Sequence, residues 1–314
     1  MRIVQIEPIG INPDDLKKIE TNFERAGHEW IHYDHKPQNE KKLIERAKEA
    51  QVIILSNLPL SKNVISQCHD LKMISVAFAG VDHIAMDVCR EKGIVVSNAT
   101  GYSNHAVSEL TIGAAINLYR KILWSDHQTR SLSDRQGFLG SELHGKTFGI
   151  IGTGQIGSQV ARLANAFGCK VLAFNRSKKT IPNVEFSNLD YLLKNSDIIS
   201  LHVPLTKETK HLIGEREIKL IKNTAILMNT ARGPVVDYHA LATALKNNNI
   251  AGAAIDVYEN EPPLEKNHPL FEAPNTILFP HIGYATKEAI QLRGKIVIDN
   301  ISQWMGGKPQ NVMH

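Results

Sequence analysis

The stretch KTFGIIGTGQIG, residues 146–157, decides the fold that we expect for this chain of 314 residues. It opens with an apolar run at 147–151, which predicts a buried β-strand, and passes directly into Gly152-x-Gly154-x-x-Gly157. The helical pattern SQVARLANAFG and a second strand-like run, KVLAFN, follow. In such a unit the first glycine permits a tight turn, the second lets the backbone approach a pyrophosphate, and the third lets the helix pack closely on the strand. The flanking elements favour a dinucleotide-binding unit over an ordinary glycine-rich turn.

Length and composition predict a soluble globular protein with two domains, since 42% of the residues are hydrophobic and 22% are charged. The net charge of +4 comes from scattered basic residues, which argues against a nucleic acid or membrane partner. No signal-peptide pattern opens the chain, and no apolar run is long enough to span a membrane. Cys68, Cys89 and Cys169 lack metal-ligand spacing, so we expect free thiols in a reducing cytoplasm and no metal site.

Strand-like and helical patterns alternate over residues 1–98 and again over 145–285. Each alternating region predicts an α/β domain in which helices cover both faces of a doubly wound parallel sheet. Between them, Ser103 is a candidate N-cap for one continuous helix over 105–130. We interpret that helix as a linker between the domains or as an element that forms a dimer.

A last helical pattern follows the final strand of the second region and is expected to return to the first. We therefore expect a discontinuous, flavodoxin-like substrate-binding domain, residues 1–100 with 287–314. Residues 101–286 are expected to form a Rossmann domain that binds the dinucleotide.

In the first region the run SVAFAGVD, residues 75–82, leaves a predicted strand and turns at Ala79-Gly80. Ligands of open α/β sheets bind outside the carboxyl ends of the strands. Exposed N–H groups on this turn would hold a carboxylate, although a plain strand-to-helix connection explains the pattern as well.

The residues after KVLAFN bear on the choice of dinucleotide. An acidic residue about 20 positions beyond the glycines normally binds the adenosine ribose. Here Asn175 is followed by Arg176, Ser177, Lys178 and Lys179. No carboxylate is present to repel a 2′-phosphate, and the cations would bind one, so we favour NADP. The alternative is NAD held through Asn175 beside a solvated basic turn.

Three predicted strand ends carry Arg232 in NTARGP, Glu261 in DVYENEP and His281 in FPHIGYAT. Taken singly, each residue has an ordinary explanation as a surface turn, a solvated acid or a hydrogen-bonded histidine. Together they place a histidine, a carboxylate and an arginine on the strand ends of one nucleotide-binding domain, which indicates a catalytic set.

At this point the chain resembles the D-isomer-specific 2-hydroxyacid dehydrogenase family over nearly its whole length. The motifs that carry the resemblance are FAGVD at 78–82, AVSEL at 106–110, GTGQIG at 152–157, HVPLT at 202–206, NTARG at 229–233, DVYENEP at 256–262 and PHIGYAT at 280–286. The resemblance implies two Rossmann-like domains, a cleft between them, and a homodimer built on the long linking helix. It also implies hydride transfer between NAD(P)H and a 2-oxo acid, giving a D-2-hydroxy acid.

The resemblance implies a role for each matching residue. His281 would donate a proton to the substrate carbonyl, with Glu261 favouring the imidazolium form, and Arg232 would bind the substrate carboxylate. The residues implied to contact the substrate are Phe78, Ala79, Gly80, Arg232 and His281. The residues implied to contact the cofactor are Gly152, Gly154, Gln155, Ile156, Gly157, Asn175, Arg176, Ser177, Lys178, His202, Val203, Pro204, Thr230, Ala231, Asp256 and Gly283.

Departures from the family pattern separate the alternatives. Phosphoglycerate-specific relatives carry arginines where this chain has Ser75-Val76-Ala77 and Ser56-Asn57-Leu58. No cation replaces them, so a D-3-phosphoglycerate dehydrogenase is the less favoured enzyme. A dinucleotide-sensing, corepressor-like binding protein is the alternative of another class, and the complete catalytic set argues against it.

Overall fold

The computed structural model describes residues 1–177, 179–260 and 263–313, and the chain divides into two compact units. One unit comprises residues 1–103 with 285–314, and the other comprises residues 104–284. The first contains a 5-stranded sheet and the second a 7-stranded sheet, and the paired strands are parallel throughout. The predicted class, α/β with two parallel-sheet domains, is confirmed. Which unit binds which ligand stays a prediction.

The sheet of the first unit has the strand order β2-β1-β3-β4-β5. Its strands are β1 (Arg2–Gln5), β2 (Glu29–His32), β3 (Val52–Leu55), β4 (Met73–Val76) and β5 (Val95–Asn98). The helices of this unit are α1 (Pro13–Arg25), α2 (Glu40–Ala47), α3 (Lys62–Ser66), α4 (Met86–Glu91) and α11 (Lys287–Met305). Strands β3 and β4 are buried along their whole length, as the continuous apolar runs of parallel strands require.

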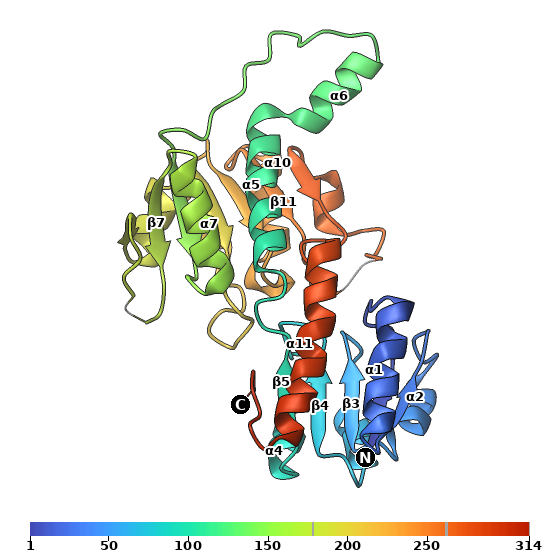
Figure 1. Cartoon of the computed structure of the whole chain (residues 1–314). Helices are drawn as coiled ribbons and strands as arrows, with labels where there is room; N and C mark the ends of the chain where they lie inside the picture. The colour runs from blue at the N-terminus through green and yellow to red at the C-terminus, as the bar shows by residue number, and fades with distance from the viewer. Residues whose placement is uncertain (178, 261–262, 314) are drawn as a thin grey trace. The chain divides into compact units, whose positions relative to one another are not determined.

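The C-terminal helix α11, red in Figure 1, packs on this first sheet. The hydroxyl of Ser75 in β4 donates a hydrogen bond to the carbonyl oxygen of Val297 at 3.1 Å. The buried amide of Asn300 donates to the carbonyl oxygen of Asn98 at 2.9 Å. Two polar contacts thus tie the end of the chain to strands near its beginning.

The sheet of the second unit has the order β12-β11-β10-β9-β6-β7-β8. Its strands are β6 (Thr147–Ile151), β7 (Lys170–Phe174), β8 (Val184–Phe186), β9 (Ile198–Leu201), β10 (Ile226–Asn229), β11 (Gly252–Ile255) and β12 (Thr276–Leu278). Its helices beyond the two that open the unit are α7 (Gln155–Ala166), α8 (Leu189–Asn195), α9 (Glu215–Ile218) and α10 (Tyr238–Lys246). The strand order reverses between β6 and β9, which is the switch point where doubly wound sheets bind dinucleotides.

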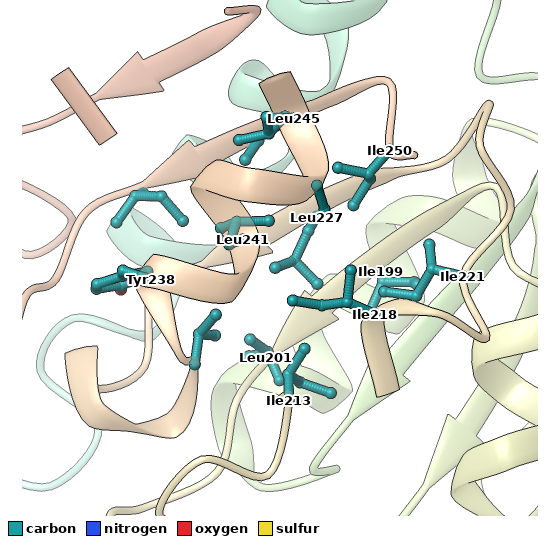
Figure 2. Close-up of a cluster of buried hydrophobic side chains, with 14 of the residues drawn as sticks. Ile199, Leu201, Ile213, Ile218, Ile221, Leu227, Tyr238, Leu241, Leu245 and Ile250 are labelled. Carbon is teal, nitrogen blue, oxygen red and sulfur yellow. The ribbon is translucent and has the colours of Figure 1, made fainter. Parts of the chain in front are cut away.

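Figure 2 shows the apolar cluster between this second sheet and α10. Ile199 and Leu227 extend from neighbouring strands toward Leu241 and Leu245 of the helix, and Tyr238 lies at its first turn. All of these side chains are buried. The cluster fixes the strands whose carboxyl ends carry the candidate site.

The single helix expected over 105–130 is wrong. The segment forms α5 (Asn104–Arg120) and α6 (Ile122–Arg130), separated at Lys121, which has a left-handed φ of +45°. Helix α5 buries Ala106, Ile112 and other residues, whereas α6 buries none. Helix α6 packs on the segment that follows it, where the rings of Trp124 and Phe138 meet edge-on with their centroids 5.5 Å apart. None of the helices in the described part of the chain has the length and apolar character that a membrane crossing requires.

A histidine lies at the switch point of the second sheet. His202 directly follows β9, and its Nε2 lies 2.8 Å from the hydroxyl of Ser200. Burial lowers the pKa of His202 to about 3, so the imidazole is neutral in the folded protein near neutral pH. The unfolded chain, with an ordinary histidine pKa of 6.5, binds more protons between these two values.

We predict that His202 makes the protein less stable as the pH falls below about 6.5. At about pH 5 the loss relative to about pH 7.5 should be about 1–2 kcal/mol from this residue. Urea unfolding at both pH values should therefore show a smaller pH dependence for His202→Gln than for the wild type. The same substitution at the exposed His239 is the control and should leave the pH dependence unchanged. An unchanged pH dependence in His202→Gln would contradict the assignment.

Candidate active site

The glycine-rich turn after β6 has the geometry that a pyrophosphate requires. Gly152 adopts φ +94°, and its N–H donates to the Phe174 carbonyl oxygen at 2.8 Å. A Cβ on Gly157 would overlap the Gly152 carbonyl oxygen, so only glycine fits there. A Cβ on Gly154, by contrast, would meet nothing within 4 Å. That open space lies at the N-terminus of α7, whose N-cap residue Gly154 has no side chain to cap the first N–H groups, and this arrangement suits an anion.

The turn after β7 holds the glycine-rich turn from the side. The side-chain oxygen of Asn175 accepts from the N–H of Thr153 at 3.2 Å, and its amide donates to the carbonyl oxygen and hydroxyl of Ser177, both at 2.8 Å. The ammonium of Lys179 donates to the Thr153 carbonyl oxygen at 2.9 Å. Arg176 is exposed, and Lys178 lies outside the described residues. The turn therefore carries cations and is hydrogen-bonded to the backbone of the glycine-rich turn.

The residues after β9 and β10 border the same sheet edge. Val203 lies against Gly152, where an added Cβ would meet its side chain, and the exposed Pro204 follows it. After β10, the hydroxyl of Thr230 lies 3.5 Å from that of Thr111 in α5. Because the strands are parallel, all of these residues lie at the carboxyl edge.

A buried asparagine shapes the turn that carries Arg232. Asn229 is fully buried; its amide donates to the Arg232 carbonyl oxygen at 3.0 Å, and its oxygen accepts from the Ala231 N–H at 3.1 Å. The same amide donates to the hydroxyl of Tyr238 at 2.9 Å. Burial raises the pKa of Tyr238 well above its ordinary value, so this phenol stays protonated and donates in turn to the carbonyl oxygen of Val257. The Arg232 side chain is half-buried, and its guanidinium donates to the Ala231 carbonyl oxygen at 2.7 Å.

A buried aspartate shapes the turn that carries His281. Asp256, which follows β11, is 2% exposed, and its two carboxylate oxygens accept from the N–H groups of Ile282 at 2.7 Å and Gly283 at 2.8 Å. His281 itself adopts φ +56°, and its ring meets that of Tyr284 edge-on at 5.5 Å. Arg232 and His281 therefore follow strands that flank β11 on either side.

Tyr258 links the segment after β11 to the segment that precedes His281. Its hydroxyl donates to the carbonyl oxygen of Phe279 at 2.9 Å, just before the histidine turn. Burial, and secondarily the charge of Asp256, raises its pKa to about 12, so it remains a donor at neutral pH. Glu261, the predicted partner of His281, lies outside the described residues, whereas nearby Glu259 pairs with His268 at 3.3 Å.

In the first unit the turn after β4 offers backbone donors. The Phe78 carbonyl oxygen accepts from the Ala99 N–H at 3.0 Å, and the Ala79 carbonyl oxygen accepts from the Asn98 amide at 2.6 Å. The N–H groups of Ala79 and Gly80 meet no hydrogen-bond acceptor in the described ranges of the chain. With its carbonyls held, the turn presents these donors for an anion.

The structure also brings a cation from another loop to a stretch that carries none of its own. The stretch Ser56-Asn57-Leu58 contains no cation, but Lys36, from the loop after β2, donates to the side-chain oxygen of Asn57 at 3.0 Å. Sequence reasoning missed this residue because the order of the strands, which brings the two loops together, is not visible in a one-dimensional pattern. Over residues 1–177, 179–260 and 263–313, no group of three or more histidine, cysteine or acidic side chains is arranged to hold a metal ion.

Comparison with known proteins places the chain in a family. The model of the family described as "D-isomer specific 2-hydroxyacid dehydrogenase, NAD binding domain" matches residues 112–283. Glyoxylate reductase from Thermofilum pendens is 41% identical over 273 residues, which cover 84% of this chain and 80% of that enzyme.

Two solved structures extend the comparison to the whole chain. An acyclic imino acid reductase in complex with NADPH and D-Arg has a TM-score of 0.92 and 32% identity, with 100% of both chains covered. D-Lactate dehydrogenase from Aquifex aeolicus, complexed with NAD and lactic acid, has a TM-score of 0.85 and 31% identity and covers 98% of this chain and 96% of its own. These matches show that the chain belongs to the D-isomer-specific 2-hydroxyacid dehydrogenases and uses a nicotinamide dinucleotide.

Proposed function

We propose that this enzyme reduces 2-oxo acids to D-2-hydroxy acids with NADPH in preference to NADH, using Arg232, Glu261 and His281. The observation that carries the proposal is the pair of supported turns after β10 and β12, which hold Arg232 and His281 on either side of the Asp256 strand. Backbone turns fixed by buried hydrogen bonds hold the attachment points of the side chains that they carry, which catalytic positioning requires.

The protein's own groups would act on the substrate as follows. The planar guanidinium of Arg232 binds the carboxylate and polarises the adjacent carbonyl. The N–H groups of Ala79 and Gly80 bind the carboxylate, and Phe78 contributes an apolar contact. His281 gives a proton to the carbonyl oxygen, becomes neutral, and regains a proton from water, with Glu261 favouring its cationic form. The bound dinucleotide supplies the hydride.

The cofactor would be held mainly by the second unit. Gly152, Gly154, Gln155, Ile156 and Gly157 would surround the pyrophosphate, as the open space beside Gly154 suggests. His202, Val203, Pro204, Thr230 and Ala231 would border the nicotinamide, with Asp256 and Gly283 near its carboxamide.

The preference for NADPH rests on the turn after β7. Asn175 is neutral, and its side chain already binds Thr153 and Ser177. Arg176 is exposed beside it, and the Lys179 ammonium lies within hydrogen-bond distance of the phosphate-binding turn. A 2′-phosphate would bind Arg176 and Ser177, and Lys178, which lies outside the described residues, is a further candidate from the sequence.

Self-association is a further part of the proposal. Helix α6 and the segment after it expose Ile122 (48%), Leu123 (60%), Leu132 (97%) and Leu139 (81%). Exposed apolar side chains gathered on one segment are typical of an interface. We propose that a second copy of the chain covers them in a homodimer.

Arg232→Ala should lower kcat/KM for 2-oxo acid reduction by about 100-fold or more, because it removes the donor that binds and polarises the substrate. Arg232→Lys should recover only part of this loss, since an ammonium cannot make the two-point contact. Steady-state assays with glyoxylate, hydroxypyruvate and pyruvate test this. Arg216→Ala, at an exposed arginine of α9, is the matched control. Full activity in Arg232→Ala would refute the catalytic assignment.

Arg176→Ala should raise KM for NADPH by about tenfold and change KM for NADH far less, because a charge-assisted hydrogen bond to the 2′-phosphate is lost. Parallel titrations of both cofactors at a saturating 2-oxo acid measure the difference. A wild-type enzyme that uses NADH as well as NADPH, with Arg176→Ala unchanged, would show that the basic turn is merely solvated.

Sedimentation velocity tests the homodimer. The wild type should sediment as a dimer, and the double substitution Leu123→Ser with Leu139→Ser should shift it toward monomer, because both side chains are exposed in the single chain. Substitution of the exposed Phe271 by Ser is the control for loss of surface apolar area elsewhere. A monomeric wild type would exclude the proposed assembly.

A further inference from the structure

The first sheet has its own topological switch point, and polar residues gather there. In the order β2-β1-β3-β4-β5 the direction of winding reverses between β1 and β3. Open α/β sheets bind ligands at the carboxyl ends of the strands that flank such a point. The residues that leave β1 and β3 at this edge include Glu7 and the segment 56–58.

Glu7 is a fully buried carboxylate that fixes this edge. Its Oε1 accepts from the N–H groups of Ser56 at 2.8 Å and Leu58 at 2.9 Å. Its Oε2 is buried and has no hydrogen-bond partner within the residues that the structure describes. The ammonium of Lys36 lies 3.7 Å from that oxygen. The lysine is thus the counterion of a carboxylate that water does not reach.

Lys36 is anchored but still has donors to offer. Its Nζ donates to the side-chain oxygen of Asn57 at 3.0 Å, while its side chain is 59% exposed. An ammonium has three donors, and the contact with Glu7 exceeds hydrogen-bond length. A ligand oxygen at this edge would therefore find an N–H whose position Asn57 and Glu7 already fix.

This group lies beside the turn proposed to bind the substrate carboxylate. The hydroxyl of Ser56 lies 3.4 Å from the Ala77 carbonyl oxygen, and the N–H of Leu60 donates to the His83 carbonyl oxygen at 2.9 Å. Leu58 and Phe78 pack against the same apolar cluster. The loops after β3 and β4 therefore run together; the first carries Asn57 with its partner Lys36, and the second carries the amides of Ala79 and Gly80.

The charges of Lys36 and Glu7 indicate which chemical group of a substrate would bind beside them. The positive charge of Lys36 is offset by the buried negative charge of Glu7, so the pair is close to neutral at a distance. A phosphate dianion would gain little attraction from a cation whose charge a buried carboxylate offsets. A hydroxyl oxygen needs only a donor, which Lys36 provides.

We propose that Lys36 and Asn57 are specificity-determining residues that bind a hydroxyl group on the side chain of the substrate, and that Glu7 positions them. This assignment rests on the proposed function and narrows its substrate class to 2-oxo acids hydroxylated next to the carbonyl carbon. The subsite lowers the KM for hydroxylated 2-oxo acids relative to acids without the hydroxyl group. It takes no part in hydride or proton transfer.

The test compares pyruvate with hydroxypyruvate, which differ by one hydroxyl. Lys36→Met keeps the length of the side chain and removes the donor. It should raise KM for hydroxypyruvate by about tenfold and change KM for pyruvate by less than about twofold, with kcat unchanged for both. Lys48→Met, at an exposed lysine just beyond α2, is the control.

Phosphohydroxypyruvate tests the charge argument. The wild type should use it less well than hydroxypyruvate. Glu7→Gln keeps an acceptor for Ser56 and Leu58 but removes the negative charge, so it should improve kcat/KM for phosphohydroxypyruvate. A wild-type preference for the phosphorylated acid would overturn the assignment to a hydroxyl group.

The outcomes separate the subsite from the proposed function. A wild type that reduces neither pyruvate nor hydroxypyruvate with either dinucleotide refutes the function and the subsite with it. A wild type that reduces both acids, with Lys36→Met unchanged or changed equally for the two, refutes the subsite alone.

Discussion

Two backbone N–H groups, from Ile282 and Gly283, meet the buried carboxylate of Asp256, and the histidine turn depends on this contact. Burying a carboxylate is costly unless hydrogen bonds replace its water, and each such bond contributes about 1.5–3 kcal/mol. Adjacent N–H groups can reach one carboxylate only if the chain turns sharply. The left-handed conformation of His281, which costs about 1–2 kcal/mol, is offset by these bonds. The placement of His281 is therefore a consequence of Asp256.

At the end of the neighbouring strand β10, neutral buried side chains hold the turn that carries Arg232. Asn229 is fully buried and binds the backbone on both sides of the arginine turn, while Tyr238 connects it to the carbonyl of Val257. Gly233 packs so closely on the Tyr258 backbone that any side chain there would clash. A rigid frame of buried polar groups thus carries Arg232, so a substitution in this frame would move the guanidinium without touching it.

Patterns that are local in the sequence predicted much of the fold of this protein. They did not predict the contacts between segments that are distant in the sequence. Hydrophobic periodicity and the glycines at 152–157 predicted the class of both domains, because each signal lies within one strand–turn–helix unit. The break at Lys121 was missed because the helical pattern continues through both helices, and periodicity does not reveal one left-handed residue between them. The short edge strand β8 (Val184–Phe186) has too few residues to show a period. The Asn229, Asp256 and Lys36 contacts follow from strand order, which periodicity does not contain.

The two cations Arg176 and Lys36 show why the order of the strands matters for function. Arg176 stands in an exposed turn beside the neutral Asn175, where the proposed 2′-phosphate would bind. Lys36 is exposed too, but its ammonium lies 3.7 Å from the buried Glu7 carboxylate. The carboxylate offsets most of the positive charge of Lys36 and leaves the N–H donors of Lys36 in place. Two cations that look alike in the sequence therefore suit different ligands. Each cation has an acidic neighbour, but Glu208 near Arg176 is exposed to solvent, whereas Glu7 beside Lys36 is buried. Solvent screens the first carboxylate and not the second, so the first cation suits the proposed anion and the second suits the proposed neutral oxygen.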